Sequence, residues 1–129
     1  MEWLEISHLL FSDWLNGRQH GYGVYEFSNG DRYEGQFRDG QQQGHGTYSS
    51  VSGDQYIGEW ERGKKQGRAR LLFAAGGVWE GVFEEDYRVT GVNITADGDM
   101  WLEQWDGDAL KERRHVNAIP AECTLCQWM

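Results

Sequence analysis

The chain has 129 residues, enough for one domain, and carries 21 acidic against 12 basic side chains for a formal net charge of −9. This balance disfavours nucleic-acid binding, which needs clustered Lys and Arg against phosphate, and it disfavours strong docking on anionic membranes. Two cysteines are too few for a disulfide scaffold and indicate a reducing compartment, so a cytoplasmic location is expected.

The N-terminal segment is the most apolar part of the chain. Its first five residues include two acids and no base, which does not fit a secretory signal. Residues 1–8 are expected to form an N-terminal cap, because a repeat array has to cover its terminal edges. Leu10, Ser12 and Trp14 then alternate like the strands that follow, so they are expected to belong to a degenerate first strand.

A unit of about 23 residues repeats along the middle of the chain. The segment YEGQF (33–37) returns as YIGEW (56–60) and again as WEGVF (79–83). After Phe83 the spacing is one residue shorter, and WLEQW (101–105) is a degraded copy with Glu103 where glycine is expected. Self-similarity of this kind is typical of repeat architectures, and about four repeats are predicted over residues 9–107.

Each unit has the pattern of a β-hairpin. Aromatic and small residues alternate with polar ones in YEGQF, which is the period of a half-buried strand. Asp39-Gly40 follows, a dipeptide favoured in tight turns that require positive φ. The return strand carries Gly44 and Gly46, and glycines at fixed places in a strand mark a close approach by another group. The ring of a neighbouring hairpin is the expected occupant.

The residues after the array, 108–129, are expected to form a C-terminal cap or tail. The apolar positions within Asp108–Ile119 suit a short helix. Cys123 and Cys126 have the spacing of half a zinc site, but a closed site needs four ligands. They are therefore expected to be free thiols.

The consensus Tyr-x-Gly-x-(Trp/Phe)-x-x-Gly-x-x-x-Gly-x-Gly-x-Tyr resembles the MORN (membrane occupation and recognition nexus) repeat. The best copies are residues 33–54 and 56–77. The resemblance implies an all-β fold: an elongated, single-layer antiparallel sheet of tandem β-hairpins with a concave groove. It also implies roles in scaffolding at cytoskeletal, ciliary and membrane-contact structures.

The rings at the two aromatic positions of the repeat are the candidate protein-binding residues. A single-layer sheet has no second layer over its apolar face, so a continuous aromatic stripe is expected to mark an interaction site. Trp and Tyr are also typical anchors of binding hot spots. The alternative is that the rings only stack on neighbouring hairpins and supply the core. The candidates are Tyr33, Phe37, Tyr56, Trp60, Trp79, Phe83, Trp101 and Trp105.

Acidic residues dominate the second half of the array, where Arg88 is the only base between Leu71 and Asp108. Glu84 and Glu85 are candidates to attract a basic or amphipathic segment of a partner, because a patch of one charge steers oppositely charged partners. A solvated face that keeps the chain soluble is the alternative.

One basic cluster falls in a predicted turn and is the candidate site for acidic phospholipids. The alternative is a hairpin tip that carries protective charge. The residues concerned are Arg62, Lys64, Lys65 and Arg68.

The sequence indicates a non-catalytic protein. Its histidines lack metal-ligand spacing and no nucleophile motif is present, so no catalytic residue, metal or cofactor is expected. The favoured function is an adaptor or scaffold that holds a helical or extended segment of another protein on an aromatic groove, in a cytoskeletal or ciliary assembly. Two alternatives stay open: membrane recruitment through the basic hairpin, and a structural unit that forms homodimers.

Overall fold

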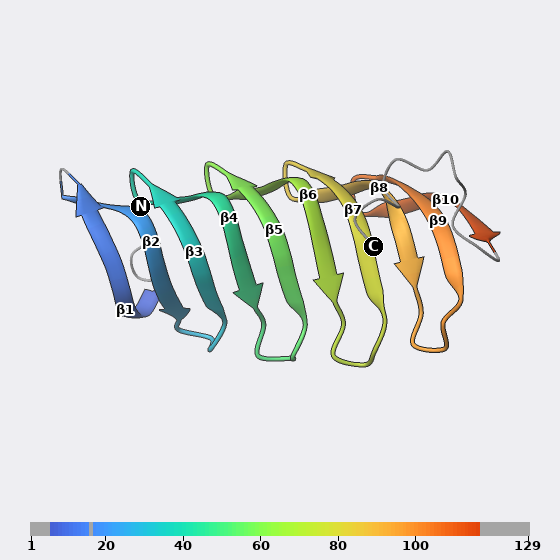
Figure 1. Ribbon diagram of the computed structural model, residues 1–129, viewed down its shortest axis with the longest axis horizontal. Helices are drawn as coiled ribbons and strands as arrows, with labels where there is room; N and C mark the ends of the chain where they lie inside the picture. The colour runs from blue at the N-terminus through green and yellow to red at the C-terminus, as the bar shows by residue number, and fades with distance from the viewer. Residues whose placement is uncertain (1–5, 16, 117–129) are drawn as a thin grey trace.

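The computed structural model describes residues 6–15 and 17–116, with side chains from residue 17 onward apart from Gln19. These residues form one open antiparallel sheet whose ten strands follow chain order, each hydrogen-bonded to the next (Figure 1). The strands are β1 (Ile6–Leu15), β2 (Arg18–Phe27), β3 (Arg32–Arg38), β4 (Gln41–Ser49), β5 (Gln55–Glu61), β6 (Lys64–Leu72), β7 (Val78–Glu84), β8 (Tyr87–Ile94), β9 (Met100–Asp106) and β10 (Ala109–Val116). The predicted all-β, single-layer architecture of tandem hairpins is confirmed.

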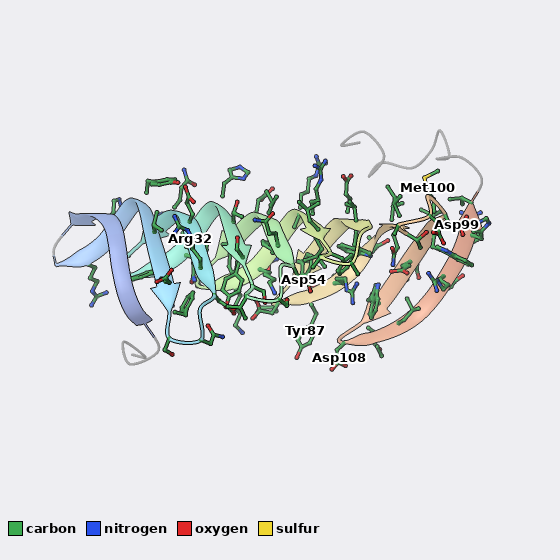
Figure 2. The ribbon with its side chains drawn as sticks, turned by 90° about the horizontal axis from the view of Figure 1, so that it is seen from below. Arg32, Asp54, Tyr87, Asp99, Met100 and Asp108 are labelled. Atoms are coloured by element: carbon green, nitrogen blue, oxygen red, sulfur yellow. The ribbon has the colours of Figure 1, made fainter. Side chains whose placement is uncertain are left out.

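The hairpin tips are tight turns that need positive φ. Asp39 and Gly40 have φ of 53° and 84°, so the turn expected at Asp39-Gly40 is present. Glu85 and Asp86 adopt φ of 51° and 76° without any glycine, a conformation that carries local strain. In Figure 2 the labelled Tyr87, next to that turn, projects away from the sheet.

The return strand of each regular hairpin is bent by a bulge. In β3–β4 the register shifts between Gly35 and Phe37, and Gly44 within the bulge has a φ of 84° that favours glycine. The β7–β8 hairpin has its shift between Val82 and Phe83, and the bulge in β8 is shorter and lacks such a glycine. The one-residue change of repeat spacing after Phe83 is therefore a residue missing from this bulge.

A row of residues with little or no side chain crosses the sheet. Register partners run from strand to strand through Gly23, Gly35, Gly46, Gly58, Ala69, Gly81 and Gly91. A Cβ on Gly46 would lie 2.2 Å from Oη of Tyr33, so glycine is needed there for the ring to lie on the backbone. The occupant was expected to come from a neighbouring hairpin, but Tyr33 lies on the other strand of the same hairpin.

Seven rings pack edge to face over this row, and we call them the ring ladder. Neighbouring centroids in the ladder lie 4.8–5.4 Å apart, the geometry favoured by aromatic quadrupoles. Each ring is at most 6% exposed, so the ladder is the hydrophobic core of the protein. In order of contact the rings are Tyr25, Phe37, Tyr33, Trp60, Tyr56, Phe83 and Trp79.

The loops between hairpins are joined to one another by aspartates. Oδ1 of Asp31 accepts a hydrogen bond from the backbone N–H of Val51 in the next loop, and Oδ1 of Asp54 accepts one from Ala74. Gly77 occupies the corresponding position of the third loop, where a φ of 96° favours glycine. The carboxylate link is therefore specific to the first repeats.

The expected C-terminal helix is wrong for the described residues, because residues 109–116 form β10. Gly107, with a φ of 63°, turns the chain back so that Arg113 pairs with Glu103 and His115 pairs with Trp101 on β9. The ring of Trp101 packs against His115, which ties the edge strand to the sheet. At the other end, β1 already begins at Ile6, inside the expected cap. Residues 117–129, with Cys123 and Cys126, lie outside the described residues.

Replacing Gly91 with alanine is expected to destabilise the protein by about 1–3 kcal/mol, as overpacking usually does. The added methyl would lie 2.4 Å from Cζ2 of Trp79 and 2.5 Å from the backbone oxygen of Glu80, and neither atom is free to move. Urea unfolding of Gly91→Ala measures the effect. Ala69→Gly is the control, because that position already holds a methyl. An unchanged midpoint for Gly91→Ala would show that the ring is not held against the backbone.

Candidate interaction surfaces

The structure places the predicted aromatic residues in two environments. Six of the eight belong to the ring ladder and are buried, whereas Trp101 and Trp105 at the C-terminal end of the sheet are only partly buried. The alternative reading of the rings as core therefore accounts for most of their surface. Direct binding by these side chains stays a prediction, and Trp101 and Trp105 have the most surface left for it.

The tyrosines of the ladder are anchored through their hydroxyls. Oη of Tyr33 donates a hydrogen bond to the backbone oxygen of Gln36 at 2.8 Å, and Oη of Tyr56 donates to that of Glu59 at 2.6 Å. Burial raises the pKa of both hydroxyls well above the ordinary value, and it raises the pKa of Tyr25 to about 12. The ladder is thus neutral and uncharged at physiological pH.

Glu103 is a buried carboxylate that sequence reasoning noted only as a departure from the repeat. It continues the row of glycines on β9 and is 3% exposed. Its Oε1 accepts hydrogen bonds from Nε1 of Trp79 and of Trp105, each at 3.1 Å. Its Oε2 accepts one from Asn93 at 3.1 Å and forms an ion pair with Arg113 at 3.4 Å. The last repeats thus differ from the earlier ones at two positions that contact each other: Glu103 stands where glycine is expected, and Trp79 stands where Tyr33 and Tyr56 stand in the earlier repeats.

Arg88 ends the ring ladder. Its guanidinium lies 3.7 Å from the ring centroid of Trp105 and 5.6 Å from that of Trp79, so one cation contacts both of these rings. Burial lowers the pKa of Arg88, and the negative charge of Glu103 partly offsets this. The last repeat is therefore joined to the array by a polar and cationic cluster rather than by ring-to-ring contact.

A groove of about 650 Å³ lies on the face opposite the rings, and we call it the polar groove. Its floor is the backbone of the glycine row at Gly35, Gly46 and Gly58, so the ring ladder lies directly behind it. Its walls come from β2 to β6 and include exposed apolar surface from Tyr22 (43%) and Ile57 (39%).

Charged side chains also line the polar groove. Glu34 and Glu59 contribute acids, and Arg68 contributes a base at the β6 side. The hydroxyl of Tyr22 donates a hydrogen bond to Glu34, which holds that wall together. Sequence reasoning singled out Arg68 only as part of the basic cluster, and it missed Tyr22, Glu34 and Glu59 because they fall between the aromatic positions. The signal that could have found the groove is an apolar residue, Tyr22 or Ile57, at a polar position of the alternation.

The predicted acidic pair and the predicted basic cluster meet at hairpin tips. Glu84 and Glu85 are exposed at the end of β7, and Glu85 forms an ion pair with Lys64 at 3.2 Å. Nζ of Lys65 lies 5.5 Å from the ring centroid of Tyr56, and Arg62 lies 3.8 Å from Glu61. Three of the four basic candidates thus already have partners at or near the tips, while Arg68 lies in the polar groove.

Within residues 6–15 and 17–116, no group of three or more His, Cys, Asp or Glu side chains is placed to hold a metal ion. The same part of the chain contains no helix long and apolar enough to cross a membrane.

Comparison with protein-family models matches the MORN repeat three times in succession, at residues 12–32, 33–55 and 56–78. The matched residues make up just over half of the chain and coincide with β1 to the start of β7. A search of curated proteins gave no match.

Proposed function

Because this chain belongs to the MORN repeat family, we propose that it is a non-catalytic adaptor that binds a segment of another protein in the polar groove. MORN repeats are commonly protein- or membrane-binding modules, and the family is generally non-catalytic. The proposal extends this to one mode of binding and to one face of the sheet. A cytoplasmic role in a cytoskeletal or ciliary assembly goes with it.

The observation that carries the proposal is the polar groove itself. The face with the ring ladder has little accessible aromatic surface at its centre, whereas the opposite face is hollowed and exposes Tyr22 and Ile57. Exposed apolar side chains beside charged groups are typical of binding sites. The ring ladder then contributes indirectly, because it packs on the opposite side of the glycine row and holds the floor of the groove in its bent shape.

The partner that fits is a helical or extended segment with apolar and basic residues. Ile57 and Tyr22 would contact its apolar side chains, and Glu34 and Glu59 would pair with its basic ones. The exposed Glu84 and Glu85 and the formal charge of −9 favour the approach of such a segment by electrostatic steering. Trp101 and Trp105 lie on the other face, so they are candidates for a separate contact outside the groove.

Replacing Ile57 with arginine is expected to weaken partner binding at least about tenfold, the scale of one hot-spot contact. The measurement is quantitative capture from lysate with wild-type and variant chains, followed by titration of the captured partner. Val51→Arg is the matched control, because Val51 is an exposed loop residue outside the groove. Unchanged affinity in Ile57→Arg, with loss in Glu84→Lys/Glu85→Lys alone, would move the binding site to the acidic hairpin tip.

Vesicle binding distinguishes membrane recruitment from the binding of a protein segment in the polar groove. We expect no binding to vesicles of acidic phospholipid at physiological salt, because Lys64 is paired with Glu85 and charges are screened over about 8 Å. Sedimentation with phosphatidylserine vesicles measures this. Tight binding that disappears in Lys64→Glu/Lys65→Glu would favour the membrane alternative over the groove.

A further inference from the structure

The face that carries the polar groove changes its character along the array. Over β3–β5 it presents polar residues such as Gln36, Thr47, Gln55 and Glu59. Over β6–β9 the same face also carries Arg68, Arg70 and Glu80, but most of its side chains near the loops between hairpins are apolar, and we call this area the apolar patch. Its residues are Leu72, Val78, Val82, Val92, Ile94, Met100 and Leu102.

The apolar patch is contiguous across the strands. Leu72 pairs with Val78, Val78 with Ile94, and Ile94 with Met100, while Val92 pairs with Leu102. The other face of β7 and β8 is covered by Trp79 and Phe83 over the glycine row, so these two strands have buried residues on both faces. Strands of that kind are typical of sheets covered on both faces.

Burial within one cross-strand row shows the same change. Ile57 is 39% exposed and Arg70 is exposed, but the next residues of the row, Glu80 and Val92, are 4% and 1% exposed. No described strand explains this, because extensive contacts among the described residues join only neighbours in the sheet. Glu80 pairs with Arg70 through Oε1 at 2.8 Å, and its buried Oε2 has no hydrogen-bond partner among the described residues.

We propose that the segment after β10, residues 117–129, covers the apolar patch. It starts at the edge of the patch, since Val116 pairs with Met100, and the labelled Met100 projects from the start of β9 in Figure 2. The segment carries Ile119, Leu125 and Trp128 and only one charged residue. At about 3.3 Å per residue it reaches roughly 40 Å, whereas the four strand spacings from β10 to β6 amount to only about 19 Å.

A tethered segment also has an advantage over a second molecule. Attachment to β10 gives residues 117–129 an effective concentration in the millimolar range, so weak apolar contacts are enough to keep them on the sheet. The covered patch then leaves the polar groove over β2–β6 as the open part of this face, and the inference does not depend on what the groove binds.

A spin label on the full chain tests this. The chain has two cysteines, so Cys123→Ser leaves Cys126 as the only thiol for a nitroxide. We expect the methyl resonances of Val92 and Ile94 to be broadened beyond detection and those of Ile57, on the same face outside the patch, to keep their intensity. Full intensity at Val92 and Ile94 would overturn the proposal.

A mixed sample separates the tethered segment from a second copy. Isotope-labelled chains without cysteines (Cys123→Ser/Cys126→Ser) are mixed with spin-labelled chains that carry no isotope. Broadening at Val92 in this sample would assign the patch to a second molecule and overturn the proposal, whereas full intensity supports it. Val92→Glu is expected to restore the resonances of Ile94 in the spin-labelled chain, and Thr47→Glu, a change in a polar part of the face, is expected to leave them broadened.

Discussion

The free energy of unfolding is expected to fall steeply above pH 10, because the buried tyrosines of the ring ladder cannot ionise in the folded chain. The hydroxyls of Tyr25, Tyr33 and Tyr56 all have a pKa raised above the ordinary value of 10.0 by burial. Burial also raises the pKa of Tyr48, outside the ladder, so the folded state keeps four protons at these buried hydroxyls that the unfolded state releases. The stability is fully present below pH 10 and is lost as the pH rises toward the folded pKa, which is about 12 for Tyr25.

The expected slope is large. Each tyrosine that is protonated only in the folded state contributes about 1.4 kcal/mol per pH unit, so four of them contribute about 5 kcal/mol per unit. Since domains are stable by only about 5–15 kcal/mol, the chain is expected to unfold before about pH 12. Urea titrations at closely spaced pH values, followed by tryptophan fluorescence, measure the slope, and absorbance at tyrosinate wavelengths follows ionisation in the same samples.

Two phenylalanine variants isolate the cause. Tyr33→Phe and Tyr56→Phe each remove one ionisable group and one hydrogen bond while keeping the ring in the ladder. Each variant is expected to be less stable at neutral pH by about 1 kcal/mol, with a slope above pH 10 reduced by about a quarter. Ionisation of all six tyrosines near pH 10 with unchanged fluorescence would contradict the burial of the ladder hydroxyls.

Replacing Glu103 with alanine is expected to destabilise the protein by about 3–5 kcal/mol, the cost of breaking a buried, hydrogen-bonded ion pair by removing one partner. The substitution leaves Nε1 of Trp79 without an acceptor at a fully buried position, and it leaves Arg113 without its carboxylate. Urea unfolding measures the loss. Glu84→Ala is the control, because Glu84 is exposed at the end of β7 and its replacement should change stability by less than about 0.5 kcal/mol.

A double-mutant cycle assigns the effect to the indole. Trp79→Phe removes the donor and keeps a ring in the ladder, so the cost of Glu103→Ala is expected to be smaller in the Trp79→Phe background, by about 1–3 kcal/mol. Additive effects of the two changes would contradict coupling between Trp79 and Glu103. A loss below about 1 kcal/mol for Glu103→Ala alone would mean that the carboxylate is solvated rather than buried.

The C-terminal end shows where local patterns fail. Residues 109–116 contain few apolar side chains, and their spacing is compatible with a short helix as well as with a strand. The pairing of Arg113 with Glu103 and of His115 with Trp101 favours the strand, and these contacts join residues on two strands that meet only in the folded sheet. The wrong expectation came from a segment whose structure depends on its partner.

The sequence by itself determined the hairpins, their turns and their order, because each of these depends on residues close together in the chain. The alternation around Tyr33 predicts the strand that the structure has as β3, and Asp39-Gly40 predicts the turn after it. Only the tertiary structure decided which face is available for binding. Tyr33 becomes fully buried through its contact with Trp60 on another hairpin and through the bent glycine floor. The open face is therefore the one with Ile57, because cross-strand packing, and not the aromatic pattern, sets how much of each side chain stays in water.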